Sequence, residues 1–177
     1  MDIRNARLYV GTYAKYNAGT LKGAWLNLYD YNDKEEFYNA CRELHADEKD
    51  PEFMFQDAEN IPESLYSESY VNEFIWEILS RIDEISNVEA FFEFCDYMYP
   101  SPFETGANID DFISDFDDAY QGEFDSEEDF AEYIVNECYN IEKTMGSLAN
   151  YFDYESFARD LFLTDYHMIG NYVFRRI

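Results

Sequence analysis

The residues of this sequence with the clearest chemical potential are its carboxylates. Between Asp50 and Glu142 the chain has 27 acidic residues and one basic residue, Arg81, whereas the rest of the chain is nearly balanced. We call residues 50–142 the acidic segment. Like charges one turn apart on a helix cost about 0.2–0.5 kcal/mol for each pair, so a segment this uniform is expected to use its electric field. The expected partner is a basic molecule.

The same carboxylates give no indication of catalysis. Acidic pairs occur throughout the segment, so none stands out as a general acid and base. The two histidines, His45 and His167, lie far apart in the sequence and are expected to pack or cap. No phosphate-binding or nucleophile motif occurs. We therefore expect no enzyme, no cofactor and no metal.

A calcium loop is a weak alternative. An EF-hand counted from Asp117 has Gly122 at position 6 and Glu128 at position 12, but Ala119 and Gln121 stand where Asp or Asn ligands are needed. A calcium-dependent acidic module is therefore kept as one rival hypothesis.

Composition also limits the partners and the compartment. Nucleic-acid binding requires Lys and Arg on one face, so direct binding to DNA or RNA is not expected. No stretch approaches the ~20 apolar residues of a membrane span, and the first residues lack the apolar run of a signal peptide.

Cys41, Cys95 and Cys138 are widely spaced and are expected to be buried reduced thiols, which fits the cytoplasm. Adaptation to high salt is an alternative explanation of the acidity, although the balanced flanks argue against it.

The first part of the chain is predicted to be rich in strands. Residues 6–13 and 24–31 are expected to form a β-hairpin with a long loop. Asp33 followed by Glu36 is typical of a capped helix, and residues 52–56 resemble another short strand.

The acidic segment is predicted to be mainly helical. Three runs of apolar residues at helical spacing indicate amphipathic helices. The runs are Val71, Phe74, Ile75, Ile78, Leu79 and Ile82; then Val88, Phe91, Phe92 and Cys95; then Ile109, Phe112, Ile113 and Phe116. Pro100 and Pro102 break the chain before the third run.

The last part of the chain is predicted to be mixed. Ser126 with Asp129, and later Asp153, are expected to cap helices, and residues 168–177 are expected to form a terminal strand. A strand-rich start, a helical middle and a mixed end together predict an α+β fold.

Carboxylates follow the sides of these helices that lie opposite the apolar runs. They are Glu73, Glu77 and Glu84; then Glu89, Glu93 and Asp96; then Asp111, Asp115 and Asp118. Within each set, successive carboxylates lie about 5–6 Å apart along the helix. At the ~1.7 Å per charge of duplex DNA, the 27 carboxylates equal about 46 Å of duplex. A solvated helix face is the simpler explanation, but such a face normally mixes both signs.

Several motifs resemble the ArdA antirestriction proteins. They are residues 8–17 (LYVGTYAKYN), 19–31, 33–38 (DKEEFY), 53–57 with 60–62, 120–124 (YQGEF), and 151–155 with 157–159. The resemblance implies a DNA mimic that occupies the DNA-binding groove of type I restriction–modification enzymes and blocks them. It also implies an element that moves between bacteria by conjugation as the source.

The resemblance further implies an elongated chain of three small modules that dimerises head to head through the last one. Pro62 and the break at Pro100 and Pro102 agree with modules at 1–61 (α/β with the hairpin), 62–102 (acidic and helical) and 103–177 (acidic α/β). Residues 144–157 or their neighbours are the expected dimer contact.

The partner-binding residues expected to imitate phosphates are exposed carboxylates of the acidic segment. They are Glu73, Glu77, Glu84, Glu89, Glu93, Asp96, Asp110, Asp111, Asp115, Asp117, Asp118, Asp125 and Asp129. The rival from another class is a generic acidic binder, or chaperone, of basic proteins, which requires the same charge but no particular enzyme.

Overall fold

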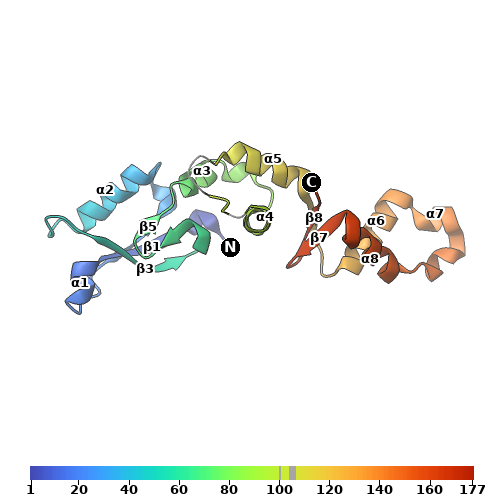
Figure 1. Cartoon of the computed structure of the whole chain (residues 1–177), viewed down its shortest axis with the longest axis horizontal. Coiled ribbons are helices and arrows are strands. Elements are labelled where there is room, and N and C mark those ends of the chain that lie inside the picture. The colour runs from blue at the N-terminus through green and yellow to red at the C-terminus, as the bar shows by residue number, and fades with distance from the viewer. Residues whose placement is uncertain (100, 104–106) are drawn as a thin grey trace. The chain divides into compact units, whose positions relative to one another are not determined.

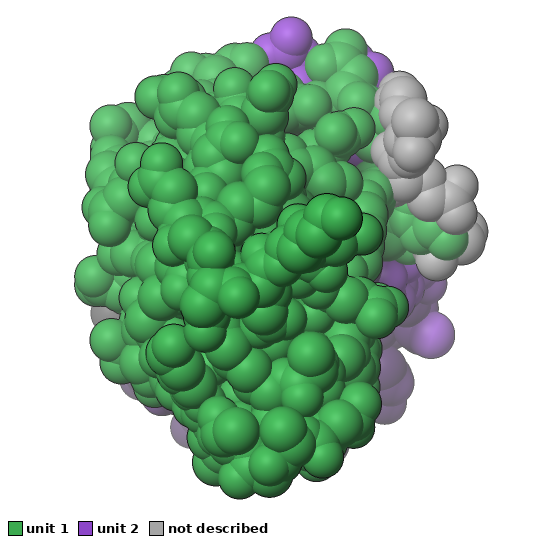
Figure 2. All heavy atoms as spheres, turned by 90° about the vertical axis from the view of Figure 1, so that its left-hand side faces the viewer, with its two compact units in different colours: residues 1–92, 99–109 green, residues 93–98, 110–177 purple. Residues whose placement is uncertain are grey.

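A computed structural model describes residues 1–99, 101–103 and 107–177 of the chain, with only the backbone of Glu142. The elements are labelled in Figure 1. The chain divides into two compact units, which Figure 2 shows in different colours. Unit 1 comprises Met1–Phe92 and Tyr99–Ile109, and unit 2 comprises Glu93–Met98 and Asp110–Ile177.

The fold is α+β, as predicted. All strand pairs are antiparallel, and they form sheets of three, two and three strands among the described residues. The division into modules at 1–61, 62–102 and 103–177 remains a prediction, and Pro100 of its second boundary lies outside the described residues. None of the helices in the described ranges is both long and apolar enough to cross a membrane.

The three-stranded sheet of unit 1 contains the predicted hairpin. Strand β1 (Arg7–Thr12) lies between β2 (Ala24–Asn27) and β3 (Phe53–Glu59). The long hairpin loop holds a short helix, α1 (Tyr13–Asn17). Strand β2 is shorter than predicted because the Asn27 side chain accepts a hydrogen bond from the Tyr29 amide at 2.9 Å and starts a 3₁₀ turn over Leu28–Asp30. A further 3₁₀ turn covers Ile3–Asn5.

Helix α2 (Lys34–Leu44) provides the core of unit 1. Its predicted cap is confirmed, because the Glu36 amide donates to Asp33 Oδ1 at 2.8 Å. The Glu36 carboxylate reaches the Asn32 amide at 2.9 Å, one residue before the cap. Phe37 is fully buried and its ring lies 6.0 Å from that of Phe55 and 5.7 Å from that of Trp76. This aromatic cluster joins α2 to the sheet and to the segment that follows it.

The segment after the sheet differs from the predicted helix that begins near residue 68. A 3₁₀ turn (Glu63–Leu65) leads into a small hairpin of β4 (Tyr66–Ser67) and β5 (Tyr70–Val71). Helix α3 covers only Phe74–Ser80, and a 3₁₀ turn follows at Ile82–Glu84. Asn72 sets the helix start, because its Oδ1 accepts from the Phe74 amide at 3.0 Å. The apolar positions were nevertheless identified correctly, and all six are buried.

The next two predicted helices are confirmed. They are α4 (Val88–Met98), which contributes residues to both units, and α5 (Ile109–Ala119). In unit 2, Phe94 of α4 lies 5.8 Å from Phe116 of α5 and 5.4 Å from Phe174, measured between ring centroids. All three rings are fully buried and form the centre of unit 2.

The remainder of unit 2 combines three helices with a second three-stranded sheet. Its helices are α6 (Glu127–Ile134), α7 (Ile141–Met145) and α8 (Tyr154–Thr164), with a 3₁₀ turn at Gly146–Tyr151. The predicted caps are confirmed: Ser126 Oγ accepts from the Asp129 amide at 3.1 Å, and Asp153 Oδ1 accepts from the Ser156 amide at 2.9 Å.

The sheet of unit 2 corrects the prediction of a single terminal strand. Strand β8 (Tyr172–Arg175) lies between β6 (Tyr120–Glu123) and β7 (Tyr166–Ile169). The predicted strand is thus part of a hairpin that turns at Gly170, whose φ of +56° suits glycine.

His167 packs between the rings of Tyr97 and Phe174, and burial lowers its pKa.

The cysteines are only partly as predicted. Cys41 and Cys95 are buried, whereas Cys138 is exposed. After α6 the chain continues as one π-helical stretch (Val135–Tyr139), and its wider turn rotates Cys138 away from the apolar face that holds Phe130. Burial raises the pKa of the Cys41 thiol to about 12, so this thiol stays protonated at neutral pH.

We predict that Phe37→Ala destabilises unit 1 by about 3–5 kcal/mol, because it removes a fully buried ring from the aromatic cluster. Urea unfolding of the full chain followed by tryptophan fluorescence measures this, because Trp25 and Trp76 both lie in unit 1. Tyr29→Ala is the matched control, since Tyr29 is 49% exposed. Equal midpoints for the two variants would contradict the assigned core.

Candidate interaction surface

Unit 1 holds four of the thirteen predicted carboxylates, and all four are exposed. They are Glu73, Glu77, Glu84 and Glu89. The predicted single helical stripe through the first three does not form, because α3 begins after Glu73 and ends at Ser80. Two of the four meet a cation. Arg81 Nη2 donates to Glu84 Oε2 at 2.6 Å, and the amino terminus lies 2.7 Å from Glu89 Oε2.

Unit 2 holds the other nine, of which eight are exposed and Asp115 is half-buried. Glu93 and Asp96 lie on α4, and α5 holds the largest group: Asp110, Asp111, Asp115, Asp117 and Asp118. The pKa of the Cys95 thiol is raised by burial first, and then by the charges of Asp96 and Asp115.

The start of α6 adds a second group of carboxylates to unit 2. Asp125 precedes the helix, and Asp129 is held in the cap, where its Oδ2 accepts from Ser126 Oγ at 2.6 Å. Negative charge at a helix N-terminus is stabilised by the helix dipole, which lowers the energy of this group. Four exposed neighbours were not among the predicted residues: Glu123, Glu127, Glu128 and Glu132. Their position around the Ser126 cap was the signal that could have identified them.

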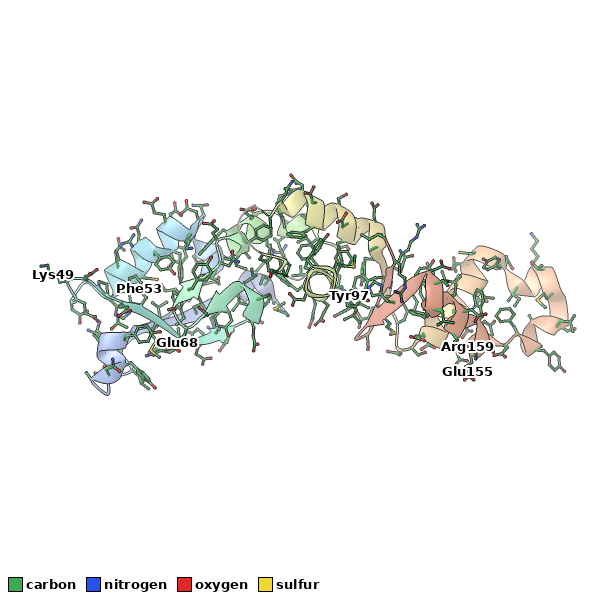
Figure 3. All side chains as sticks on the ribbon, in the orientation of Figure 1. Lys49, Phe53, Glu68, Tyr97, Glu155 and Arg159 are labelled. Atoms are coloured by element: carbon green, nitrogen blue, oxygen red, sulfur yellow. The ribbon has the colours of Figure 1, made fainter. Side chains whose placement is uncertain are left out.

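The surface of α5 and α6 is of one sign. The sequence from Glu93 to Glu142 has no Lys or Arg, so no basic side chain of that stretch neutralises these carboxylates. After Glu142 the chain contains both acidic and basic side chains. Glu155 and Arg159 lie one turn apart on the same side of α8 (Figure 3). A surface of one sign attracts a basic partner over several ångströms of water.

The calcium alternative is wrong for the window that suggested it. Helix α5 continues through Asp117 and Asp118 to Ala119, and β6 follows at once. The twelve-residue loop of an EF-hand therefore does not form.

Within the described residues, one group of side chains is close enough to hold a metal ion: His45, Asp47 and Glu48. Its centre already contains a cation. Lys15 Nζ lies 2.8 Å from His45 Nδ1, 2.8 Å from Asp47 Oδ1 and 3.0 Å from Glu48 Oε1. His45 Nε2 lies 3.2 Å from the Val10 carbonyl oxygen and donates to it, which leaves Nδ1 to accept from Lys15. The ammonium group thus takes the place that a metal would occupy.

The two carboxylates of this Lys15 cluster are held in their charged form. Hydrogen bonds from Lys15 and Lys22 hold the pKa of Asp47 well below its usual range. For Glu48, a hydrogen bond from Thr12 and then one from Lys15 lower the pKa. The cluster ties the start of α1 to the end of α2, and it uses two of the chain's few basic residues internally.

Comparison with known proteins agrees with the motif resemblance. A family model described as "Antirestriction protein (ArdA)" matches residues 8–174. No curated protein matches the chain.

We predict that Lys15→Met lowers the urea midpoint of unfolding at pH 7. The difference between its midpoint and that of wild type narrows as the pH falls below about 4. The sign follows from the lowered carboxyl pKa values. Their contribution to stability is present above the unfolded-state pKa and is lost as the pH falls through the folded-state values. Lys22→Met is the comparison and should give a smaller effect of the same sign, because among the described residues Lys22 pairs with Asp47 alone and its side chain is 65% exposed. A difference that is the same at pH 7 and pH 3 would contradict this assignment.

Proposed function

The chain belongs to the ArdA antirestriction protein family, and on this premise we propose that it is a DNA mimic that inhibits type I restriction–modification enzymes. The exposed carboxylates take the place of phosphates in the DNA-binding groove of the enzyme. The basic side chains that normally hold DNA then hold this protein. Inhibition follows because the protein and DNA compete for one groove.

The observation that carries the proposal is the surface of one sign on α5 and α6. Exposed pairs of opposite charge normally lower the energy of a helix surface, and the stretch from Glu93 to Glu142 has no basic residue to form them. The repulsion that remains is relieved when a basic groove supplies the missing cations. Catalysis is not part of this function, and the family is one of inhibitors.

The proposal assigns the phosphate role to the thirteen predicted carboxylates, but not equally. Glu84 and Glu89 already meet cations, and Asp129 is held in a helix cap. We expect Asp111, Asp117, Asp118 and Asp125 to contribute more, because they are exposed on unit 2 and far in sequence from any basic residue. Each single charge contributes little, since the field is a sum.

A generic binder of basic proteins is the alternative function. The charge of the surface alone suits it equally well, and membership of the antirestriction family favours a restriction enzyme as the partner. With that partner, the cytoplasm is the proposed site of action, and a mobile genetic element that enters a new host is the proposed source.

We predict that replacing Asp111, Asp117, Asp118 and Asp125 together by Asn weakens inhibition of a type I enzyme by roughly tenfold at low salt. The estimate takes about 0.35 kcal/mol for each of the four exposed ion pairs, in the lower part of the usual range for such pairs. Asp117→Asn alone is expected to change inhibition less than about threefold. DNA cleavage by the purified enzyme, measured against inhibitor concentration, provides the test.

The control variant for this experiment also loses four negative charges, but all of them lie outside the acidic segment. It replaces the exposed Glu35 and Glu43 by Gln and the exposed Asp30 and Asp165 by Asn. We expect it to inhibit nearly as well as wild type. Equal weakening by the two sets would favour total charge, and the generic binder, over a DNA-like surface on unit 2.

We also propose that the chain forms a homodimer through residues 144–157 and their neighbours. Support comes from large apolar side chains on the surface of this segment: Met145 is 43% exposed, Leu148 60% and Tyr151 85%. Beside them is an apolar cavity of about 430 Å³ whose lining includes Tyr139 and Phe157. A contiguous apolar surface of this kind is typical of a protein interface. A dimer would double the charged surface presented to the groove.

We predict that Leu148→Asp combined with Tyr151→Asp converts a dimer into a monomer, because two charges enter the apolar contact. Light scattering after gel filtration at micromolar concentration measures the mass. Leu163→Asp is the control, since Leu163 is 69% exposed on α8 outside the segment. A wild-type protein that is monomeric under these conditions would contradict the proposed dimer.

A further inference from the structure

The outer face of the unit 1 sheet carries two rows of side chains that cross its three strands. The strand register places Asn27, Arg7 and Glu59 in one row. It places Trp25, Tyr9 and Asp57 in the next row, two residues along each strand. Residues opposite each other, and residues two apart, share a face of a sheet, so both rows point the same way.

The first row shows how this face binds a cation. Arg7 Nε and Nη2 lie 2.8 Å and 2.6 Å from Glu59 Oε2. The Arg7 guanidinium carbon lies 4.8 Å from the centre of the Trp25 ring. A carboxylate and an aromatic ring together thus hold one guanidinium group.

The second row has the same two components and no cation of its own. A cavity of about 490 Å³ lies over it, lined by Tyr9, Tyr16, Leu21, Trp25, Met54, Gln56 and Asp57. None of the lining residues is basic. Asp57 is exposed and forms no salt bridge with any residue in the described part of the chain. Asp57 Oδ1 accepts a hydrogen bond from the Ala58 amide at 2.9 Å. The neighbouring Arg7 is paired with Glu59, so Asp57 has no cationic partner among the described residues.

The walls of this cavity are fixed before any ligand arrives. The Tyr9 hydroxyl donates to the Leu21 carbonyl oxygen at 2.8 Å, and the Tyr9 and Trp25 rings meet edge to face at 5.6 Å. The chain at Gly23, just before β2, lies very close to β1, since a Cβ on Gly23 would be only 2.4 Å from the Val10 carbonyl oxygen. Tyr16 remains 50% exposed at the rim, where it is available to a ligand.

We propose that this cavity binds an arginine side chain of the protein partner. The guanidinium group packs against the aromatic wall and pairs with Asp57, as Arg7 does with Trp25 and Glu59. Arginine suits the cavity better than lysine, because its flat and weakly hydrated group stacks on rings and forms two parallel hydrogen bonds with a carboxylate. The source of the arginine, the basic DNA-binding groove of the restriction enzyme, rests on the proposed function. The cavity is thus a local contact, in addition to the summed field of the acidic segment.

The cavity is tested directly with the full-length protein and a short peptide, acetyl-Gly-Arg-Gly-amide. In an NMR titration we expect saturable shifts of the Trp25 indole signal, weak in affinity. The matched peptide with citrulline, which has the same shape without the charge, should cause no saturable shift. Trp76→Phe identifies the Trp25 signal, because Trp25 and Trp76 are the only tryptophans. Equal shifts with both peptides would overturn the proposal.

Variants of the protein locate the binding. Asp57→Asn should abolish the arginine-dependent shift, whereas Asp30→Asn should not. Asp30 is the matched control because it is exposed and lines the neighbouring cavity that contains Arg7. Retained binding by Asp57→Asn would overturn the proposal.

The enzyme as the source of the arginine is tested in the cleavage assay. Asp57→Asn and Tyr16→Ala should each weaken inhibition by roughly two- to fivefold, as expected for one exposed ion pair and one exposed cation–π contact. Asp30→Asn and Tyr29→Ala should inhibit like wild type. If wild type inhibits and the cavity variants inhibit equally well, the enzyme does not use the cavity. If wild type fails to inhibit, the proposed function fails, and the peptide titration still decides the cavity.

Discussion

The structure depends on a balance between repulsion among exposed carboxylates and burial of the aromatic side chains behind them. Helix α5 shows the balance within eleven residues: five aspartates occupy it, while Ile109, Phe112, Ile113 and Phe116 are buried. Burial of one such side chain contributes about 1.5–3 kcal/mol, several times the cost of one like-charged pair. The helix is therefore stable although its outer surface has a single sign. The repulsion that remains is available to a basic partner.

The basic residues of unit 1 act mainly within the unit. Lys15 fills the cluster of His45, Asp47 and Glu48, and Arg7 is bound by Glu59 and Trp25. The charges of these cations are thus largely neutralised within unit 1. Asp57, next to the Arg7 pair, forms no ion pair with any residue in the described ranges. In this way the distribution of a few lysines and arginines decides where the protein can receive a basic side chain.

Features that depend on neighbouring residues were predictable from the sequence, and features that depend on distant contacts were not. The caps at Asp33, Ser126 and Asp153 and helices α4 and α5 follow from local spacing, and the structure has them where they were predicted. The helix expected from residue 68 is shorter, because β5 pairs with β4 and the Asn72 side chain then starts α3.

Exposure of the carboxylates was predictable from helical periodicity. The partner of Glu89 was not, because the amino terminus lies 88 residues away in the sequence. The rows on the outer face depend on a strand register that includes a bulge between Tyr9 and Val10, and no sequence pattern indicates it.

The most direct test of DNA mimicry is competition between this protein and a short duplex for a purified type I enzyme. Fluorescence anisotropy of a labelled duplex, measured at increasing salt, gives both affinities. DNA mimicry predicts that the protein displaces the duplex completely and that its own affinity falls with salt about as steeply as that of DNA. A complex that holds protein and duplex together, or an affinity that does not change with salt, would contradict it.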